Sequence, residues 1–391
     1  MTRIPYTRGL WQRGRNLFTK GFFFDRPLLL IQSDDWGRVG LRDQEGFEEL
    51  RSAGVLLGEN PYDLYTLETS EDVADLRTVL SKHRDSAGRS AVMAMYFVVA
   101  NVDFSVARQS NYKEIPLRLL SKSLPGRWWR PGLLDSYRGG IQEGTIYPAL
   151  HGTTHFCRPA VRRELVAEGK RGDLLRTLWR AETPYIFWRM PWIGYEYWDP
   201  AGKREERHLP IELQSAAIGE AVEGFSGLFG RKPFSACAPG YRANASTHCA
   251  WKRAGIKVAQ NGPDKIVAPS FDRYGILNLC RNINFEPALD RHFSVERCLR
   301  TASECFARGV PAVLSTHSIN FHSTVKDFRS TTLRFLNEFL DELTKRHPNL
   351  LYVHEEDLYQ LIGQGVCRRA DCAVKVGVRQ KNIHLARIRA A

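Results

Sequence analysis

The chain has 391 residues, of which 43% are hydrophobic and 25% are charged, and its formal net charge is +13 at pH 7. This composition is typical of a soluble globular protein with one large domain or two ordinary ones. No apolar run approaches the roughly 18 residues that a membrane-spanning helix needs, so the sequence excludes an integral membrane protein of the helical class.

The positive charge is concentrated at the two ends of the chain. Residues 1–26 contain six Lys or Arg and one acidic residue, and residues 367–391 contain seven and one. Because the body between them is nearly neutral, we expect no specific nucleic-acid partner. We predict a basic, partly apolar segment at 1–26, one domain at 27–365 and a basic tail at 366–391. The first segment could lie on an anionic membrane as an amphipathic helix or pack over the outside of the domain.

Two further features bear on the compartment. The first residues have no continuous apolar stretch and no small-residue cleavage site, which makes a poor secretory signal. The eight cysteines are scattered without a pairing rhythm, so we predict reduced thiols, and the spacing of Cys367 and Cys372 does not suit a zinc ribbon. We therefore expect a cytoplasmic protein, either free or peripheral at the inner membrane face.

The first predicted strand, at 27–37, ends in two adjacent carboxylates, Asp34 and Asp35. An apolar run of this length predicts a buried strand that delivers acids to its carboxyl end, where parallel α/β folds place their chemistry. Adjacent like charges raise one another's pKa unless a cation intervenes. The pair therefore indicates a metal or a basic partner, with a solvated turn as the alternative.

Strands and helices then alternate along the chain. Further strands are predicted at 91–99, 145–150, 234–238, 256–259, 310–316 and 350–353, and helices at 43–53, 70–84, 159–169, 211–229, 247–253, 294–308, 327–346 and 355–362. Residues 105–144 and 170–208 are predicted as long loop excursions over a barrel mouth. The second is rich in aromatic residues that either stack on sugars or cover a hydrophobic flank. Seven strands that alternate with helices predict a parallel α/β sheet, most economically closed into a barrel.

Three predicted strands end in groups that bind metals or move protons. After the two aspartates come His151 with His155, and then His317. The i, i+4 spacing of the first two histidines lets both imidazoles face one point. Two histidines and a carboxylate are the usual minimum for an open catalytic Zn²⁺ site and equally for other divalent ions, so the spacing does not choose the metal.

Four short motifs resemble those of a known family. In chain order they are Ser33-Asp-Asp-Trp-Gly37, His151-Gly-Thr-Thr-His155, Ala238-Pro-Gly-Tyr241 and Leu314-Ser-Thr-His317. Together they resemble the NodB-homology polysaccharide deacetylases, carbohydrate esterase family 4, from about Pro27 to Ile362. The resemblance implies a deformed (β/α) barrel of about seven parallel strands with one divalent cation. Zn²⁺ is the first candidate, and Co, Fe, Ni or Mn ions are the alternatives.

By motif position, the resemblance assigns a role to each group. The metal ligands would be Asp35, His151 and His155. Asp34 would be the general base acting on a metal-bound water, and His317 would be the acid that protonates the leaving amine. Backbone N–H groups near Tyr241, together with the cation, would stabilise the tetrahedral oxyanion.

The candidate substrate contacts at the barrel mouth are Trp36, Tyr241, Arg242 and Asn320. Trp36 could instead plug the top of the core. Asn320 could serve in ordinary loop packing, which is the explanation favoured for His322.

The sequence also departs from the family pattern. Family members generally place an arginine two residues before the proline of the third motif, where it holds the catalytic aspartate, and here that residue is Cys237. Either Arg242, three residues beyond Pro239, supplies the guanidinium from the other side of the turn, or the basicity of Asp34 is tuned differently. The usual acidic partner of the catalytic histidine has no clear counterpart, and Asp264 is the one acid in the corresponding stretch.

The function expected from these residues is removal of an N-acetyl group from a saccharide or saccharide precursor by a metal-dependent hydrolase. Without a leader, the enzyme would act on nucleotide-linked or lipid-linked precursors inside the cell. Two alternatives remain. One is hydrolysis of another non-peptide C–N bond, such as a cyclic amide. The other is a catalytically weak carbohydrate-binding homologue that keeps the metal. A long open groove would favour a saccharide, and a closed pocket would favour a small ring.

Overall fold

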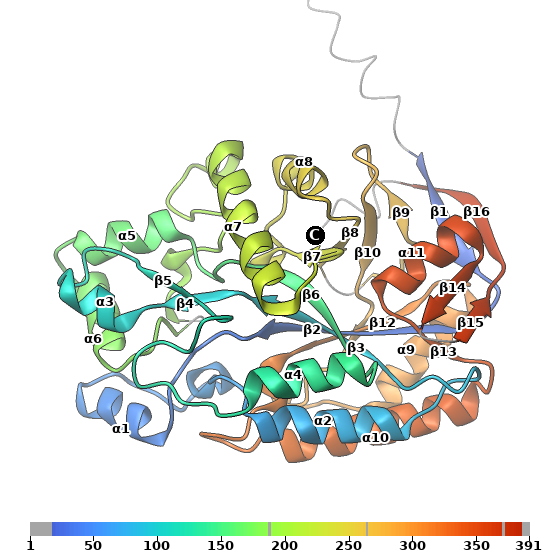
Figure 1. The fold of residues 1–391 in the computed structure, drawn as a ribbon, viewed down its shortest axis with the longest axis horizontal. Coiled ribbons are helices and arrows are strands. Elements are labelled where there is room, and N and C mark those ends of the chain that lie inside the picture. The colour runs from blue at the N-terminus through green and yellow to red at the C-terminus, as the bar shows by residue number, and fades with distance from the viewer. Residues whose placement is uncertain (1–17, 187–188, 263–264, 370–371, 385–391) are drawn as a thin grey trace, which may run out of the picture.

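The computed structural model describes residues 18–186, 189–262, 265–369 and 372–384, which form a mixed α/β structure (Figure 1). The strands are β1 Phe18–Phe24, β2 Leu28–Trp36, β3 Met93–Val98, β4 Ala100–Val102, β5 Leu117–Leu119, β6 Ile146–Gly152, β7 Ser235–Cys237, β8 Val258–Asn261, β9 Ser270–Phe271, β10 Leu277–Cys280, β11 Ile283–Asn284, β12 Ala312–His317, β13 Leu351–Tyr352, β14 Val366–Arg369, β15 Cys372–Lys375 and β16 Val378–His384. The helices are α1 Gln44–Ser52, α2 Ser70–Lys82, α3 Phe104–Gln109, α4 Leu133–Gln142, α5 Arg158–Val166, α6 Lys170–Arg180, α7 Ile211–Phe229, α8 Ala245–Ala254, α9 Val295–Ala307, α10 Arg329–Arg346 and α11 Glu355–Gln364.

The centre of the fold is a curled parallel sheet in the order β12, β2, β3, β6, β7, β8, β10. The bent segment from Leu277 to Asn284 reaches both edges of this sheet, because β10 pairs with β8 and β11 pairs with β12, each in parallel. The parallel strands therefore form the deformed barrel that the sequence predicts. Every residue of β2, β3 and β6 is buried, as expected of parallel strands covered on both faces.

Two short strands of this arrangement, β10 and β11, were not predicted. Residues 277–284 were not predicted as a strand, whereas the predicted strand at 350–353 is the short β13, which pairs with the first residues of β2. All seven predicted strands therefore occur, with β13 parallel to β2, and the sequence missed the short parallel strands β10 and β11. Sequence periodicity is weak in segments this short, because two to four residues hold too few apolar positions to show a pattern.

Helices cover the outside of the barrel in adjacent pairs. Figure 1 shows α2, α4 and α10 side by side along one flank, where α2 packs against both of its neighbours, and α7 and α8 pair on another. The segment 105–144, predicted as an excursion over the mouth, contains α4 and so serves largely as the crossover between β3 and β6. Similarly, the segment 170–208 begins with α6, which packs on α5.

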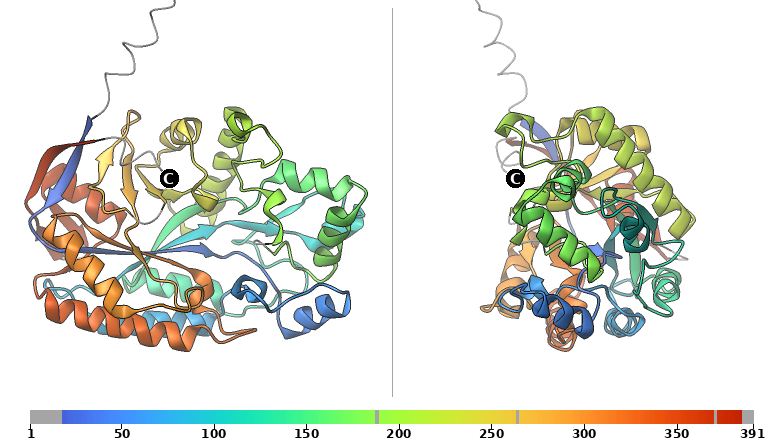
Figure 2. Two further views of the ribbon diagram at one scale, coloured as in Figure 1. Left: turned by 180° about the vertical axis from the view of Figure 1, so that it is seen from behind. Right: turned by 90° about the vertical axis from the view of Figure 1, so that its left-hand side faces the viewer.

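The two chain ends meet in an antiparallel ribbon. β1 pairs with β16 from Phe18 opposite His384 to Phe24 opposite Val378, and β1 joins the main sheet through β9. Figures 1 and 2 show this ribbon at the opposite end of the molecule from α1. The helical alternative for the N-terminal segment is therefore wrong for residues 18–24, and residues 1–17 lie outside the described part. Strands from both predicted tails belong to the same sheet as the barrel.

Two further predictions concern the cysteines and membrane-spanning helices. All eight cysteines are free thiols, as predicted. In the described part of the chain, no helix has both the length and the apolarity that a membrane span requires.

Candidate active site

The predicted chemical groups meet at the carboxyl ends of the parallel strands. Asp34 and Asp35 end β2, His151 lies near the end of β6, and His317 is the last residue of β12. Because β12 and β2 are neighbours in register, the Cα atoms of His317 and Asp34 lie directly opposite each other. His155 comes from the loop that connects β6 to α5.

A break in strand regularity lets adjacent aspartates serve one site. Successive side chains of a regular strand point to opposite faces, so Asp34 and Asp35 would normally diverge. Asp35 instead has a φ of 75°, in the left-handed region, and the register between β2 and β3 shifts between Ser33 and Trp36. The hydroxyl of Tyr65 donates a 2.8 Å hydrogen bond to the carbonyl of Asp35 and supports this strained turn.

Asp35, His151 and His155 form a compact, buried triad. Asp35 Oδ1 lies 3.4 Å from His151 Nε2 and 3.3 Å from His155 Nε2. Apart from these imidazoles, the oxygen has no polar partner among the described residues. Burial lowers the pKa of His155 well below its usual range, which keeps the ring neutral.

The orientation of the His151 ring is fixed by a hydrogen bond at Nδ1, the ring nitrogen that faces away from Asp35. Its Nδ1 lies 3.0 Å from the carbonyl of Cys237, a pure acceptor, so Nδ1 carries the proton and Nε2 presents its lone pair to the centre. An unpartnered buried carboxylate oxygen with two imidazole nitrogens is the donor set that a divalent cation requires. The residues present therefore fit the metal that the resemblance implies.

A second set of donors, Asp34, His151 and Cys237, is also close enough to share an ion. Its members are already engaged, however. Both oxygens of Asp34 accept hydrogen bonds from Arg281, and burial raises the pKa of the Cys237 thiol well above its usual range. A protonated thiol is a poor ligand, so the triad with Asp35 is the better metal site.

Asp34 is held by a guanidinium that the sequence did not reveal. Arg281, directly after β10, donates two hydrogen bonds of 2.6 Å to the two Asp34 oxygens. Burial alone would raise the pKa of Asp34, but the charge and hydrogen bonds of Arg281, together with the nearby His151 and His317, outweigh burial and the pKa is lowered. The prediction that Arg242 replaces the family arginine is wrong. Arg242 is exposed, and its guanidinium lies 4.9 Å from the ring centre of Trp198.

His317 is likewise paired with a residue from another segment. Its Nδ1 lies 2.6 Å from Glu286 Oε1, and its side chain retains 25% exposure toward the site. Burial alone would lower the pKa of His317, but the charge and hydrogen bond of Glu286 raise it to about 9. Glu286 thus occupies the place for which Asp264 was considered, and Asp264 lies outside the described residues. No spacing rule connects Glu286 to His317, so the sequence offered no signal for this pair.

The structure corrects two of the predicted substrate contacts. Asn320 is fully buried. Its amide donates to Glu286 Oε2 at 2.6 Å, and its oxygen accepts from the Ala288 N–H at 2.9 Å. Asn320 therefore orients the partner of His317. Trp36 is also fully buried and stacks on Phe321 with ring centres 5.7 Å apart, so it plugs the core.

The buried position of Trp36 leads to a stability prediction. Replacing Trp36 by Ala is expected to lower the free energy of unfolding by about 3–5 kcal/mol, because truncation of a large core side chain leaves a cavity. Urea denaturation followed by circular dichroism measures this loss. The Trp36→Phe variant keeps most of the packing and should lose less. An unchanged stability in Trp36→Ala, or a selective rise in KM in Trp36→Phe, would instead indicate a substrate contact.

Tyr241 lies next to the site, but its backbone is engaged. Its hydroxyl accepts a 2.7 Å hydrogen bond from Arg281. Its N–H donates to the carbonyl of Ala238 at 2.8 Å, and the N–H of Arg242 donates to the carbonyl of Pro239 at 3.2 Å. These amides close a turn. The expectation that they receive the oxyanion is therefore not met in this conformation.

Aromatic side chains from the segment 170–208 wall the triad. The rings of Tyr185 and Tyr195 lie 6.2 Å and 5.7 Å from that of His155. Tyr195 also covers Gly240, where a Cβ atom would lie 2.2 Å from the tyrosine ring. These two residues have the covering role, and the centre beneath them is enclosed. His322, 1% exposed and packed edge-on against Tyr65, is a packing residue as favoured from the sequence.

Comparison with known proteins relates the chain to solved structures alone. No family model and no curated protein matches it. A proposed polysaccharide deacetylase from Mycobacterium smegmatis is 11% identical with a TM-score of 0.45, over 86% of this chain and 90% of that one. A proposed polysaccharide deacetylase from Pseudomonas aeruginosa PAO1 has the same identity and score, over 87% and 92%. A 4-alpha-glucanotransferase from Thermococcus litoralis is 11% identical with a TM-score of 0.43, over 88% and 41%.

Other matching structures are family 4 carbohydrate esterases, and one of them is described as a pseudoenzyme. The matches thus include the class that the four sequence motifs resemble. At these identities and scores, the likeness assigns no activity and no residue role to this chain.

Proposed function

We propose that this chain is a metal-dependent hydrolase that removes an N-acetyl group from a saccharide or saccharide precursor. The observation that carries the proposal is the arrangement of three groups at one barrel end. The metal-ligand triad of Asp35, His151 and His155 shares the carboxyl ends of the strands with a carboxylate held ionised by Arg281 and an imidazole held protonated by Glu286. A base and an acid beside an electrophilic centre are what amide hydrolysis needs.

The cation would be held by Asp35 Oδ1 and the Nε2 atoms of His151 and His155. When bound, a divalent ion such as Zn²⁺ supplies a Lewis acid that makes water nucleophilic near neutral pH and polarises a carbonyl. Asp34, ionised beside Arg281, accepts the proton of the attacking water. His317, with its pKa raised to about 9, carries a proton at neutral pH and donates it to the leaving nitrogen. Glu286 stabilises the imidazolium before that transfer.

One observation favours the second candidate, hydrolysis of a compact or cyclic amide. The two principal ligands are enclosed, since Asp35 is 2% and His151 is 3% exposed, and tyrosine rings wall the site. An enclosed centre of this kind suits a small ring better than a sugar chain, which needs the aromatic segment to open. The non-catalytic alternative is disfavoured, because a binding module has no physical need for both Asp34–Arg281 and His317–Glu286. A cytoplasmic location remains a prediction from the sequence.

The test measures metal content and acetate release together, on wild type and on His155→Ala. Chitooligosaccharides and UDP-N-acetylglucosamine are offered with added Zn²⁺ or Co²⁺. We expect about one equivalent of metal and acetate release in wild type, and loss of both in the variant, because removal of one of three protein ligands empties an open site. His83→Ala, which removes a histidine at the end of α2, is the matched control and should retain both.

The outcomes separate the candidates. Metal without acetate from any acetylated sugar would keep the site but point to cyclic amides, which would then be assayed for ring opening. Absence of metal from the wild-type protein would contradict the proposal itself.

A further inference from the structure

A second buried arginine, Arg38, contacts the triad through Asp35. Arg38 follows β2 and is 4% exposed. Its Nη1 donates a 2.6 Å hydrogen bond to the hydroxyl of Tyr185, and its guanidinium lies 3.8 Å from the centre of the Tyr65 ring. Contacts of this kind with two aromatic residues hold a guanidinium in one place. Arg38 is therefore fixed independently of any bound ligand.

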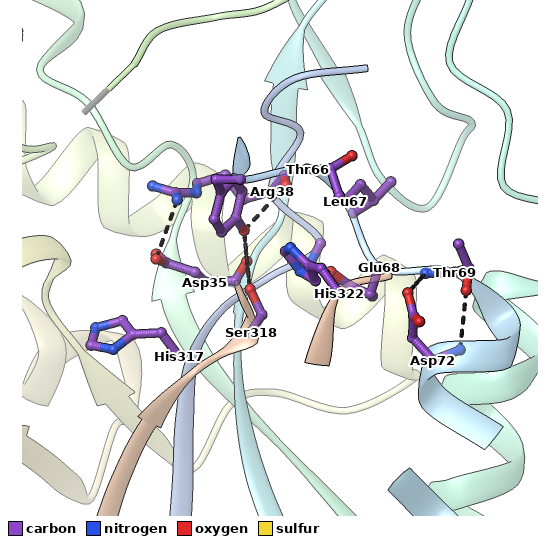
Figure 3. Close-up of polar contacts among 12 residues, drawn as sticks. Asp35, Arg38, Thr66, Leu67, Glu68, Thr69, Asp72, His317, Ser318 and His322 are labelled. Atoms are coloured by element: carbon purple, nitrogen blue, oxygen red, sulfur yellow. Dashed lines mark hydrogen bonds and ion pairs between the residues drawn. The ribbon is translucent and has the colours of Figure 1, made fainter. Parts of the chain in front are cut away.

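The two oxygens of Asp35 face different groups. Oδ1 is directed at the imidazoles of His151 and His155, whereas Oδ2 lies 3.3 Å from Nη2 of Arg38. Figure 3 shows the guanidinium of Arg38 reaching the Asp35 carboxylate from one side, with His317 on the other. The carboxylate is therefore divided between a metal side and an arginine side.

The backbone around Asp35 is anchored by hydrogen bonds. The Asp35 carbonyl accepts hydrogen bonds from Tyr65 at 2.8 Å and from the Ser318 hydroxyl at 3.3 Å (Figure 3). Two residues later, the N–H of Gly37 donates to Glu68 at 2.9 Å. With the backbone fixed at Asp35 and Gly37, the oxygen that Asp35 directs toward the two histidines depends on what holds Oδ2.

We propose that Arg38 is a positioning residue that occupies Asp35 Oδ2, so that the aspartate offers a cation Oδ1 alone. The inference rests on the proposed function, because it concerns the same metal site. Carboxylates bind cations through one oxygen or through both. Restriction to one oxygen leaves coordination positions for water and for the amide carbonyl. The positive charge of Arg38 also partly neutralises Asp35, so that the carboxylate offsets less of the charge of the ion.

Arg38 therefore lowers the affinity of the site for the metal and leaves the bound ion more electrophilic. A positive charge within a few ångströms of a dication in a buried site is repulsive. Without it, Asp35 can chelate through both oxygens and neutralise the ion more fully. A substitution that merely damaged the site would weaken metal binding, whereas removal of Arg38 should make metal binding tighter.

The experiment compares wild type with Arg38→Met, Arg38→Lys and the control Arg42→Met. Arg42 is also buried, but it pairs with Asp43, Glu45 and Glu49 beside α1 and touches none of the triad. Zn²⁺ affinity is measured by chelator competition, and the coordination of Co²⁺ by its visible absorption. We expect Arg38→Met to bind Zn²⁺ about tenfold more tightly and to show weaker Co²⁺ absorption, as a higher coordination number produces.

The remaining variants make the result specific. Arg38→Lys keeps the positive charge and should stay close to wild type in both measurements. Arg42→Met should match wild type in metal binding whatever its stability, and circular dichroism checks that each variant is folded. Unchanged or weaker Zn²⁺ binding by folded Arg38→Met, or an unchanged Co²⁺ spectrum, overturns the inference. Failure of wild type to bind metal overturns the proposed function instead, so the two failures are distinguishable.

Discussion

Arg281→Met is expected to lower the free energy of unfolding at pH 7 by about 3–5 kcal/mol, because it leaves the buried carboxylate of Asp34 without its partner. Arg281 makes two hydrogen bonds of 2.6 Å to Asp34 and has no exposed surface. Methionine fills similar volume but removes the charge. Urea unfolding measures the loss, and acetate release should fall by about 100-fold or more, because a displaced or protonated Asp34 no longer serves as a base.

The pH dependence of this loss has a definite sign. In the wild type, Arg281 depresses the pKa of Asp34, so this pair stabilises the folded state above the ordinary value of 3.8 and less as pH falls through the depressed pKa. In the variant, burial is opposed only by His151 and His317, so the pKa of Asp34 rises relative to the wild type. The stability deficit should therefore be larger at pH 7 than near pH 4. A deficit independent of pH would show that lost packing, rather than lost charge pairing, is responsible.

A second substitution provides the control. The Sγ of Cys237 lies 3.8 Å from Asp34 Oδ2, so an arginine at 237, where the related family generally has one, starts close to the same carboxylate. Adding Cys237→Arg to Arg281→Met should recover part of both stability and activity. Arg42→Met, which removes a buried arginine away from the site, should leave acetate release unchanged. Loss of activity in Arg42→Met would show that any buried arginine has this effect.

Glu286→Gln is expected to move the alkaline limit of activity toward lower pH. The carboxylate of Glu286 outweighs burial and raises the pKa of His317 from its ordinary 6.5 to about 9. With a neutral amide, the pKa should return toward 6.5. At pH 8 the protonated fraction of His317, and with it the rate, would then fall about 30-fold. The pH–rate profile between pH 6 and 10 measures the shift.

The pair of His317 and Glu286 also stabilises the folded protein. Because the pKa of His317 is raised on folding, this stabilisation decreases as pH rises. The contribution of His317 is fully present below about pH 6.5 and is lost as pH rises through about 9. The ring resonances of His317, followed by NMR in metal-free protein, report its pKa directly, since the charge of a bound cation would lower it. Glu304→Gln, at an exposed position on α9, is the matched control and should leave the profile unchanged. An unshifted His317 pKa in Glu286→Gln would contradict the assignment.

The local part of the site follows from short stretches of sequence. The two carboxylates at the end of an apolar run and the His151 to His155 spacing are each contained within a few residues. Strand burial and the position of strand ends depend on that local pattern, which is why β2, β6 and β12 lie where predicted. Long amphipathic helices such as α7 and α10 are recognisable for the same reason.

The partners of these groups were decided by the tertiary structure. Arg281 is 247 positions from Asp34 along the chain, and Glu286 is 31 from His317, so neither distance carries a periodic signal. Both partners come from the bent segment that joins β10 to β11 and from the loop that follows it. The antiparallel ribbon of β1 and β16 likewise joins opposite ends of the chain.

Sequence alone determined the fold class, most of the strand ends and the identity of the candidate ligands, because these depend on local hydrophobic pattern and residue chemistry. The tertiary structure alone decided which charges accompany them. It placed Arg281 beside Asp34, Arg38 beside the Oδ2 atom of Asp35, and Glu286 beside His317. Trp36 and Asn320 became buried for the same reason. Whether a side chain faces substrate or core depends on what distant segments pack over it, and residue type and spacing do not encode that packing.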